Sequence, residues 1–286
     1  MLWQRVATAV VLLLLLLPAL FSEAHAPLYA VALVFIAAGA WEWSRLNGYP
    51  GLPALLSGAA CAIACALAWR AGWPEQRLPG LWAGAALLWL AGGAWLLRAG
   101  AASWRSRARP MRLAAGLLVL LLAWLAVAQA RAVGIHFLLS VLVLVWAADI
   151  CAYFTGRAWG GRWFKRRLAP TISPGKSWEG VAGAVIGVVA LAWAWAELET
   201  GSPRQSPSLY TRLFEAGPWL WLPALLWLTA MSVVGDLVES LVKRAAAVKD
   251  SSQLLPGHGG VLDRLDALLP TLPLAMFLYG LFEQSP

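Results

Sequence analysis

Acidic and basic side chains gather between Asp236 and Asp266 of this otherwise apolar chain, at a spacing that suits phosphate chemistry. If the segment that starts at Asp236 is helical, Asp236, Ser240 and Lys243 share one face, because positions i, i+4 and i+7 align on a helix. Asp263 and Asp266 follow about one helical turn apart. Carboxylates that converge from two segments make the hard-oxygen site that Mg²⁺ prefers. The neighbouring cations suit phosphate oxygens, so the stretch indicates chemistry on polyphosphates. These cations are Lys243, Arg244, Lys249 and Arg264.

The segment between the acids is built to turn. Gly257, Gly259 and Gly260 are residues that let a chain fold back tightly and approach another group closely. His258 lies among them, and it either donates a hydrogen bond to a phosphate or shapes the turn. A single charge near a membrane surface is usually an orientation charge, but an acid such as Asp236, just inside an apolar helix, is costly and indicates a partner or a function.

A second polar stretch runs from Asp149 to Glu179. Asp149 lies near the end of an apolar segment, where a carboxylate is expected to pair with a cation or to help form a site. Ser173, Lys176 and Glu179 follow in a segment that is rich in glycine and proline. The two stretches hold most of the side chains in this sequence that could do chemistry.

Both stretches resemble signature regions of the phosphatidate cytidylyltransferases, the CDP-diacylglycerol synthases of bacterial membranes. The stretch from Ser240 to Asp266 shows no departure from the signature of this family. It reads Ser240-x-x-Lys243-Arg244-x4-Lys249-Asp250, then His258-Gly259-Gly260, then Asp263-Arg264-x-Asp266. The other match contains Asp149, Arg157 and the segment from Ile172 to Gly180. There the family usually has a basic residue and a Thr, where this chain has Gly175 and Ser177.

The resemblance implies that CTP and phosphatidic acid are the substrates and that CDP-diacylglycerol and pyrophosphate are the products. It implies that Asp236 and Asp263 hold the catalytic Mg²⁺, with a second cation as an open alternative, and that Asp266 either binds the metal or orients a ligand. The other expected catalytic residues are Lys243, Arg244 and Arg264. The expected substrate-binding residues are Asp149, Ser173, Lys176, Glu179, Ser240, Lys249, Asp250, His258, Gly259 and Gly260. A homodimer is also implied, and no nucleic-acid partner is expected.

Long apolar helices must position these residues. The 286 residues are 61% hydrophobic and 13% charged, against roughly 45–50% and ~25% in soluble chains. A soluble domain of this length cannot bury so much apolar surface, so we expect an all-α, polytopic integral membrane protein. We expect N-terminal transmembrane helices over residues 1–130 and a catalytic region with active-site loops over 131–286. The nine expected spans are Leu2–Phe21, Ala26–Trp41, Gly51–Trp69, Leu78–Leu97, Leu113–Ala130, Gly134–Gly156, Trp178–Ala196, Pro218–Gly235 and Ala267–Phe282.

The positive charges predict an orientation. With the N-terminus inside, 17 of the 22 Lys and Arg residues fall on the cytoplasmic side and 5 outside, as the positive-inside rule requires. The C-terminus is then outside, and the active-site loops face the cytoplasm of a bacterial inner membrane. The first segment has Arg5 before an apolar core, like a signal peptide, but no clean cleavage site follows, so we expect a retained helix.

Two other functions need to be weighed. A CTP-dependent lipid kinase would transfer the γ-phosphoryl group and release CDP, so product analysis separates it from a cytidylyltransferase. A transporter would place Asp149 and Asp236 near the membrane midplane, on helices broken there, whereas the charges here gather at one face. A phosphate-binding loop ending at Lys176 is rejected, because Pro170 stands where that motif needs its first glycine.

Overall fold

The computed structural model describes residues 2–200 and 206–282, and over these ranges the chain forms helices and no strands. The first half consists of α1 (Leu2–Phe21), α2 (Ala26–Leu46), α3 (Leu52–Arg70), a 3₁₀ turn (Trp73–Glu75), α4 (Pro79–Leu87), a π-helical turn (Leu88–Gly93), α5 (Ala94–Ser106) and α6 (Arg109–Val133). The second half consists of α7 (Ile135–Trp159), α8 (Trp178–Glu199), α9 (Leu209–Glu215), α10 (Pro218–Ala245), α11 (Leu262–Leu265) and α12 (Leu268–Phe282).

Eight helices in the described part of the chain are long and apolar enough to cross a membrane, with α4 and α5 counted as one. This confirms the predicted all-α class and the polytopic membrane architecture. Each of the nine predicted segments is helical, but the last, α12, has only 15 residues. The short α9 was not predicted.

Helix α10 runs well past the predicted end at Gly235, as far as Ala245. It therefore carries Asp236, Ser240 and Lys243 on a continuous helix, as their spacing requires. The helix ends where Ala247 takes a positive φ of 59°. There the N–H of Val248 donates to the carbonyl of Lys243 and that of Ala247 to the carbonyl of Arg244. This pattern closes a helix by satisfying its last carbonyls.

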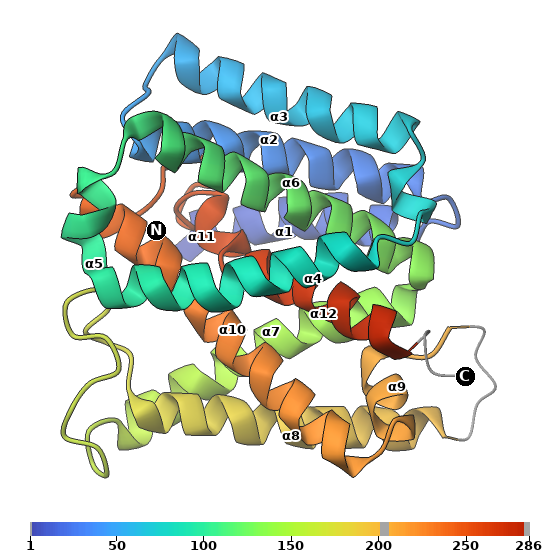
Figure 1. Ribbon diagram of the computed structural model, residues 1–286. Coiled ribbons are helices and arrows are strands. Elements are labelled where there is room, and N and C mark those ends of the chain that lie inside the picture. Colours follow the sequence, from blue (N-terminus) through green and yellow to red (C-terminus); the bar gives the residue numbers. More distant parts are fainter. Residues whose placement is uncertain (1, 201–205, 283–286) are drawn as a thin grey trace.

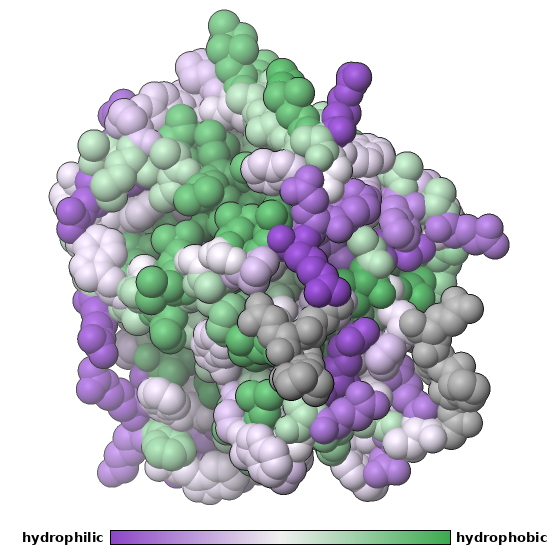
Figure 2. All heavy atoms as spheres, turned by 45° about the vertical axis from the view of Figure 1, so that its right-hand side comes forward, coloured by the Kyte–Doolittle hydropathy of each residue, from purple (hydrophilic) through white to green (hydrophobic). Residues whose placement is uncertain are grey.

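The helices lie side by side in a bundle, with α10 running obliquely across it (Figure 1). Green apolar side chains cover the middle of the face in Figure 2, and hydrophilic ones gather toward both sides. Large apolar side chains such as Leu14, Ile186 and Leu198 are well exposed on this bundle. Such a surface suits lipid, since in water it would be an unusually large exposed apolar patch.

The segments that carry the two polar stretches meet at one end of the bundle, on the left in Figure 1. We call this the polar end and define it as residues 160–177, residues 246–261 and the start of α1. The Thr8 hydroxyl donates to the carbonyl of Pro256 at 2.9 Å. Arg244 Nε donates to the carbonyl of Ile172 at 3.2 Å and so joins the two segments. The division of the chain at residue 130 remains an interpretation, because α12 packs against both α6 and α10.

Two glycines let α7 and α8 pack closely along their length. A Cβ at Gly183 would overlap the Thr155 side chain, and a Cβ at Gly187 would overlap Cys151. Gly183 and Gly187 therefore form the helix-packing pair that their four-residue spacing indicates.

Gly183→Ala is expected to destabilise the protein by about 1–3 kcal/mol, because the added methyl group overpacks this contact. The measurement is thermal unfolding of the purified protein in detergent. Gly84→Ala on α4 is the matched control, since a Cβ there meets nothing within 4 Å. An equal melting temperature for Gly183→Ala and the control would contradict the close packing of α7 on α8.

Candidate active site

A cavity of about 400 Å³ opens between α7, the start of α8 and α10. Three predicted site residues line it from three parts of the chain: Asp149 on α7, Lys176 just before α8, and Asp236 on α10. Tyr153 and Arg157 line the same cavity, and the Arg157 guanidinium donates to the Tyr153 hydroxyl at 3.1 Å. The fold thus brings the two polar stretches together around a single space.

An ion pair between Lys176 and Asp236 joins the two stretches. Lys176 Nζ lies 2.6 Å from Asp236 Oδ2, and both side chains are partly exposed, at 24% and 32%. The Ser240 hydroxyl donates to the other oxygen, Asp236 Oδ1, at 3.3 Å. Because the pair faces the cavity rather than the interior, Lys176 can exchange this carboxylate for another anion, such as a phosphate.

A second, more buried group of charges lies on the same helix. Lys243 Nζ lies 2.5 Å from both Glu239 Oε2 and Asp263 Oδ1. The Glu239 side chain is only 3% exposed, and the Lys243 ammonium is the cation that contacts it. Sequence reasoning missed Glu239, although its position four residues before Lys243 on a helix could have indicated the ion pair.

Asp263 ties the loop of the second polar stretch to α10. Its Oδ2 accepts hydrogen bonds from the Ser251 N–H at 3.0 Å, the Ser251 hydroxyl at 2.9 Å and the Gly260 N–H at 2.7 Å. Burial alone would raise the pKa of Asp263, but hydrogen bonds from Lys243 and Gly260 hold it at about 2. Asp263 is therefore ionised at neutral pH and fully engaged in hydrogen bonding.

Asp266 lies close enough to Asp236 and Asp149 to be affected by their negative charge. Burial, together with the nearby Asp236 carboxylate and a smaller contribution from Asp149, raises the pKa of its carboxyl to about 7. A carboxylate flanked by two others binds a proton or a cation more readily than one alone. The three acids, two of which line the cavity, therefore form a region that attracts positive charge.

Glu179 has a role in the structure that the sequence did not reveal. It is 2% exposed, and its Oε1 accepts hydrogen bonds from the N–H groups of Gly161, Trp163 and Phe164 at 3.0–3.1 Å. Glu179 thus holds the segment that begins after α7 beside the cavity. Its other oxygen, Oε2, is buried without a hydrogen-bond partner.

Several predicted site residues lie at the polar end without lining the cavity. Arg264 donates from Nε and Nη2 to the carbonyl of His258, which helps to fix the turn. The N–H of His258 donates to Leu255, while its Nδ1 is buried without a partner, so both readings of this residue stay open. The other predicted residues outside the cavity lining are Ser173, Glu179, Ser240, Lys243, Arg244, Lys249, Asp250, Gly259, Gly260, Asp263 and Asp266.

The donor set of the cavity fits a hard divalent cation in part. Asp149 and Asp236 supply carboxylate oxygens to the same space, which is the chemistry that Mg²⁺ prefers. Within residues 2–200 and 206–282, however, no group of three or more His, Cys, Asp and Glu residues is arranged to hold a metal. Asp263 would have to give up the Lys243 ammonium to bind one. The predicted pairing of Asp236 with Asp263 around one ion therefore stays a prediction.

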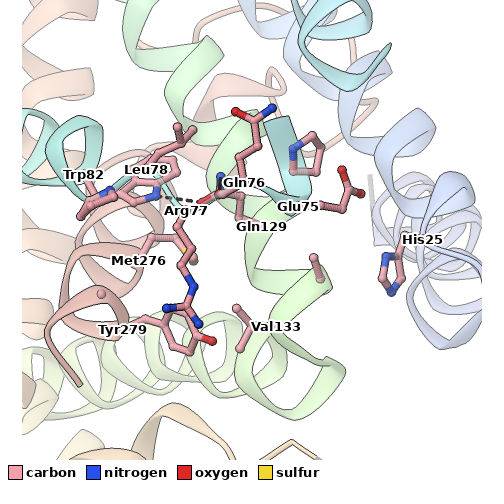
Figure 3. A pocket seen from close by; sticks show the side chains of 14 residues that line it. His25, Glu75, Gln76, Arg77, Leu78, Trp82, Gln129, Val133, Met276 and Tyr279 are labelled. Atoms are coloured by element: carbon pink, nitrogen blue, oxygen red, sulfur yellow. Dashed lines mark hydrogen bonds between the residues drawn. The ribbon is translucent and has the colours of Figure 1, made fainter. Parts of the chain in front are cut away.

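A second cavity, of about 360 Å³, contains none of the predicted site residues (Figure 3). It is built around Gln129, which accepts a hydrogen bond from Trp82 Nε1 and donates to the carbonyls of Trp73 and Gln76. Arg77 extends toward the ring of Tyr279 in this cavity. His25 lines it too. This residue follows the end of α1, whose start lies at the polar end.

The fold and the site define a class: a polytopic helical membrane protein with a charged, partly open cavity between α7, the start of α8 and α10. The model of the cytidylyltransferase family matches residues 3–282, and the chain belongs to that family.

Individual relatives carry a more specific name. The chain is 39% identical over 285 residues to a phosphatidate cytidylyltransferase of Pseudomonas aeruginosa, an alignment that covers 96% of this chain and 95% of that protein. It is 45% identical over 146 residues to a phosphatidate cytidylyltransferase of Haemophilus influenzae, covering 51% of this chain and 46% of that protein. A phosphatidate cytidylyltransferase of Bacillus subtilis is 39% identical over 150 residues, which is 52% of this chain and 49% of that protein.

Glu42 is the site-related residue that sequence reasoning missed most completely. It lies on α2, far from both polar stretches in sequence, and its carboxylate contacts the loop that leads to Asp263. An acid at the end of an apolar segment was the available signal, but nothing local in the sequence indicates which segment it contacts.

Proposed function

We propose that this chain transfers the cytidylyl group of CTP to phosphatidic acid and releases pyrophosphate, which makes CDP-diacylglycerol for phospholipid synthesis. The observation that carries this proposal is the similarity to the Pseudomonas aeruginosa phosphatidate cytidylyltransferase over 96% of the chain. The match to the family model over residues 3–282 agrees with it. A cavity that combines carboxylates with Lys176 and Arg157 suits a nucleotide triphosphate better than an uncharged ligand.

In this reaction an oxygen of the lipid phosphate attacks the α-phosphorus of CTP. The bond from that phosphorus to the oxygen of the β-phosphate breaks, and pyrophosphate leaves with the bonding electrons. Negative charge accumulates on the phosphoryl oxygens and on the leaving group, so catalysis depends mainly on positioning and on positive charge. Lys176 and Arg157 are the cations in the cavity, and we expect them to bind phosphate oxygens of the nucleotide.

The roles of the acids follow from the same charge balance. We propose that Asp236 and Asp263 hold Mg²⁺, with Asp149 and Asp266 beside them. The metal, when bound, would neutralise charge on the triphosphate. The carboxylates of Asp149 and Asp236 in one cavity support this assignment. A bound metal would take the place of the ammonium groups that now pair with Asp236 and Asp263.

We also propose nine spans, with the N-terminus and the active site on the cytoplasmic side of a bacterial inner membrane and the C-terminus outside. Two arginines from different helices make contacts near the end of α10: Arg105 donates to the carbonyl of Ala245, and Arg244 donates to the carbonyl of Ile172. At the other end, Arg131 donates to the carbonyl of Ser22. The clustering of cations at one end is what the positive-inside rule predicts for the cytoplasmic side. A homodimer remains part of the proposal.

The test is an assay of the purified protein in detergent with radiolabelled CTP and phosphatidic acid, with and without Mg²⁺. We expect labelled CDP-diacylglycerol and an equal amount of pyrophosphate, and loss of both when a chelator removes the metal. Release of CDP with no cytidylylated lipid would contradict the proposal and would favour the lipid kinase.

A further inference from the structure

Glu42 is a fully buried acid whose hydrogen bonds all go to one distant loop. Its side chain is 0% exposed. Oε1 accepts from the Ser252 hydroxyl at 2.5 Å and the Val261 N–H at 2.9 Å. Oε2 accepts from the Ser251 hydroxyl at 3.1 Å and the Leu262 N–H at 2.7 Å. Both oxygens are thus satisfied by donors that lie more than about 200 residues away along the chain, and each of these charge-assisted bonds is stronger than a neutral one.

These contacts give α11 a cap from another part of the chain. The first N–H groups of a helix have no partner within the helix, and a carboxylate near them is stabilising. Here the N–H groups of Val261 and Leu262 point to Glu42, while that of Gly260 points to Asp263. Glu42 on α2 and Asp263 of the candidate site therefore each accept some of the N–H groups at the end of this loop.

Glu42 and Asp263 are also linked through a single hydroxyl. Ser251 Oγ lies 3.1 Å from Glu42 Oε2 and 2.9 Å from Asp263 Oδ2. A Cβ at Gly260 would overlap this hydroxyl and would come within 2.5 Å of Glu42 Oε1. The glycine at position 260 is thus explained by the space that the Ser251 hydroxyl and the Glu42 carboxylate occupy.

We propose that Glu42 is a positioning residue for catalysis: it fixes the loop of residues 251–262 so that Asp263 and Lys243 keep the geometry that the reaction needs. The inference rests on the proposed function. Glu42 does not line the cavity, so it acts through Ser251 and the start of α11 rather than on a substrate. Loss of its charge leaves four donors of the loop poorly paired and lets Asp263 move.

Glu42→Gln is the test, because it keeps the size of the side chain and removes its charge. We expect kcat for CDP-diacylglycerol synthesis to fall about 10–100-fold, as for other groups that orient a ligand, with KM for CTP changed less than about threefold. Glu199→Gln is the matched control. Glu199 is also buried and accepts hydrogen bonds from the Ser208 N–H and from Thr211, but these belong to α9 and the residue before it. We expect that variant to lower the melting temperature and to leave kcat within about twofold.

A double-mutant cycle separates positioning from general destabilisation. If Glu42 acts through Ser251, the losses in kcat from Glu42→Gln and Ser251→Ala will not add, because both variants break the same link to Asp263. Fully additive losses, or an unchanged kcat in Glu42→Gln, would overturn the inference. Should Glu42→Gln fail to fold, Ser252→Ala removes only one of the four hydrogen bonds, and we expect it to lower kcat several-fold at unchanged KM; an unchanged kcat there would equally overturn it.

The same experiments separate this inference from the function on which it rests. A wild-type protein that makes no CDP-diacylglycerol would contradict the proposed function. A wild-type protein that does make it, together with a Glu42→Gln variant of normal kcat, would contradict only the role of Glu42.

Discussion

Asp236→Asn is expected to lower kcat for CDP-diacylglycerol synthesis by about 10²–10³-fold, the range seen when one charge-stabilising group is removed from an active site. Asp236 lines the cavity and pairs with Lys176 at 2.6 Å. An amide can neither neutralise this ammonium nor contribute charge to a metal site. The measurement is the initial rate of product formation at saturating CTP, repeated over a range of Mg²⁺ concentrations.

Arg107→Ala provides the comparison for this variant. Arg107 is exposed and lies over the ring of Trp95 at 4.8 Å, away from the cavity lining. We expect its rate to stay within about twofold of the wild type, as for surface substitutions away from a site. Equal rates for Asp236→Asn and Arg107→Ala would remove Asp236 from the catalytic machinery and, with it, the proposed metal site.

Asp263→Asn is expected to reduce turnover as strongly, about 10²–10³-fold, and to destabilise the loop as well. The aspartate accepts four hydrogen bonds, one from Lys243 on Oδ1 and three on Oδ2. An amide offers one acceptor atom, so its NH₂ group must face either the ammonium or the N–H groups of Ser251 and Gly260. Each buried donor left without a partner costs about 1–3 kcal/mol.

Two measurements therefore test Asp263→Asn: the rate of CDP-diacylglycerol synthesis and the melting temperature in detergent. Glu215→Gln is a suitable control, because Glu215 is an exposed acid on α9, outside the cavity lining. We expect both quantities to fall in Asp263→Asn and neither in the control. Near-normal turnover in Asp263→Asn would show that this acid neither binds metal nor sets the geometry of the site.

These two aspartates differ in how far the sequence alone could predict their surroundings. The spacing of Asp236, Ser240 and Lys243 predicts one helical face, and α10 carries all three with Ser240 donating to Asp236. Lys243, by contrast, contacts Glu239 and Asp263 rather than Asp236. Helical periodicity is a local property, so it gives the face of a residue but not the partner that packs against that face.

The ends of the helices show the same difference between what local sequence predicts and what tertiary contacts decide. Apolar runs of sufficient length predict where helices form, and every predicted span is helical in the structure. The predicted span ends at Gly235, and the continuation of this helix through Asp236, Ser240 and Lys243 was only a condition of the predicted shared face; α10 does continue, as far as Ala245. Their polar side chains have partners both within the helix, as Ser240 donates to Asp236, and on other segments, as Lys176 pairs with Asp236.

The sequence by itself determined the all-helical membrane class, the two polar stretches and their resemblance to one family of enzymes, because these depend on composition and on spacings within short segments. Only the tertiary structure decided that Lys176 pairs with Asp236, that Glu179 holds the segment after α7, and that Glu42 caps α11. Such pairings join groups far apart in the chain, and a buried carboxylate takes whichever donors the packing of helices brings to it. No local pattern in the sequence encodes that choice.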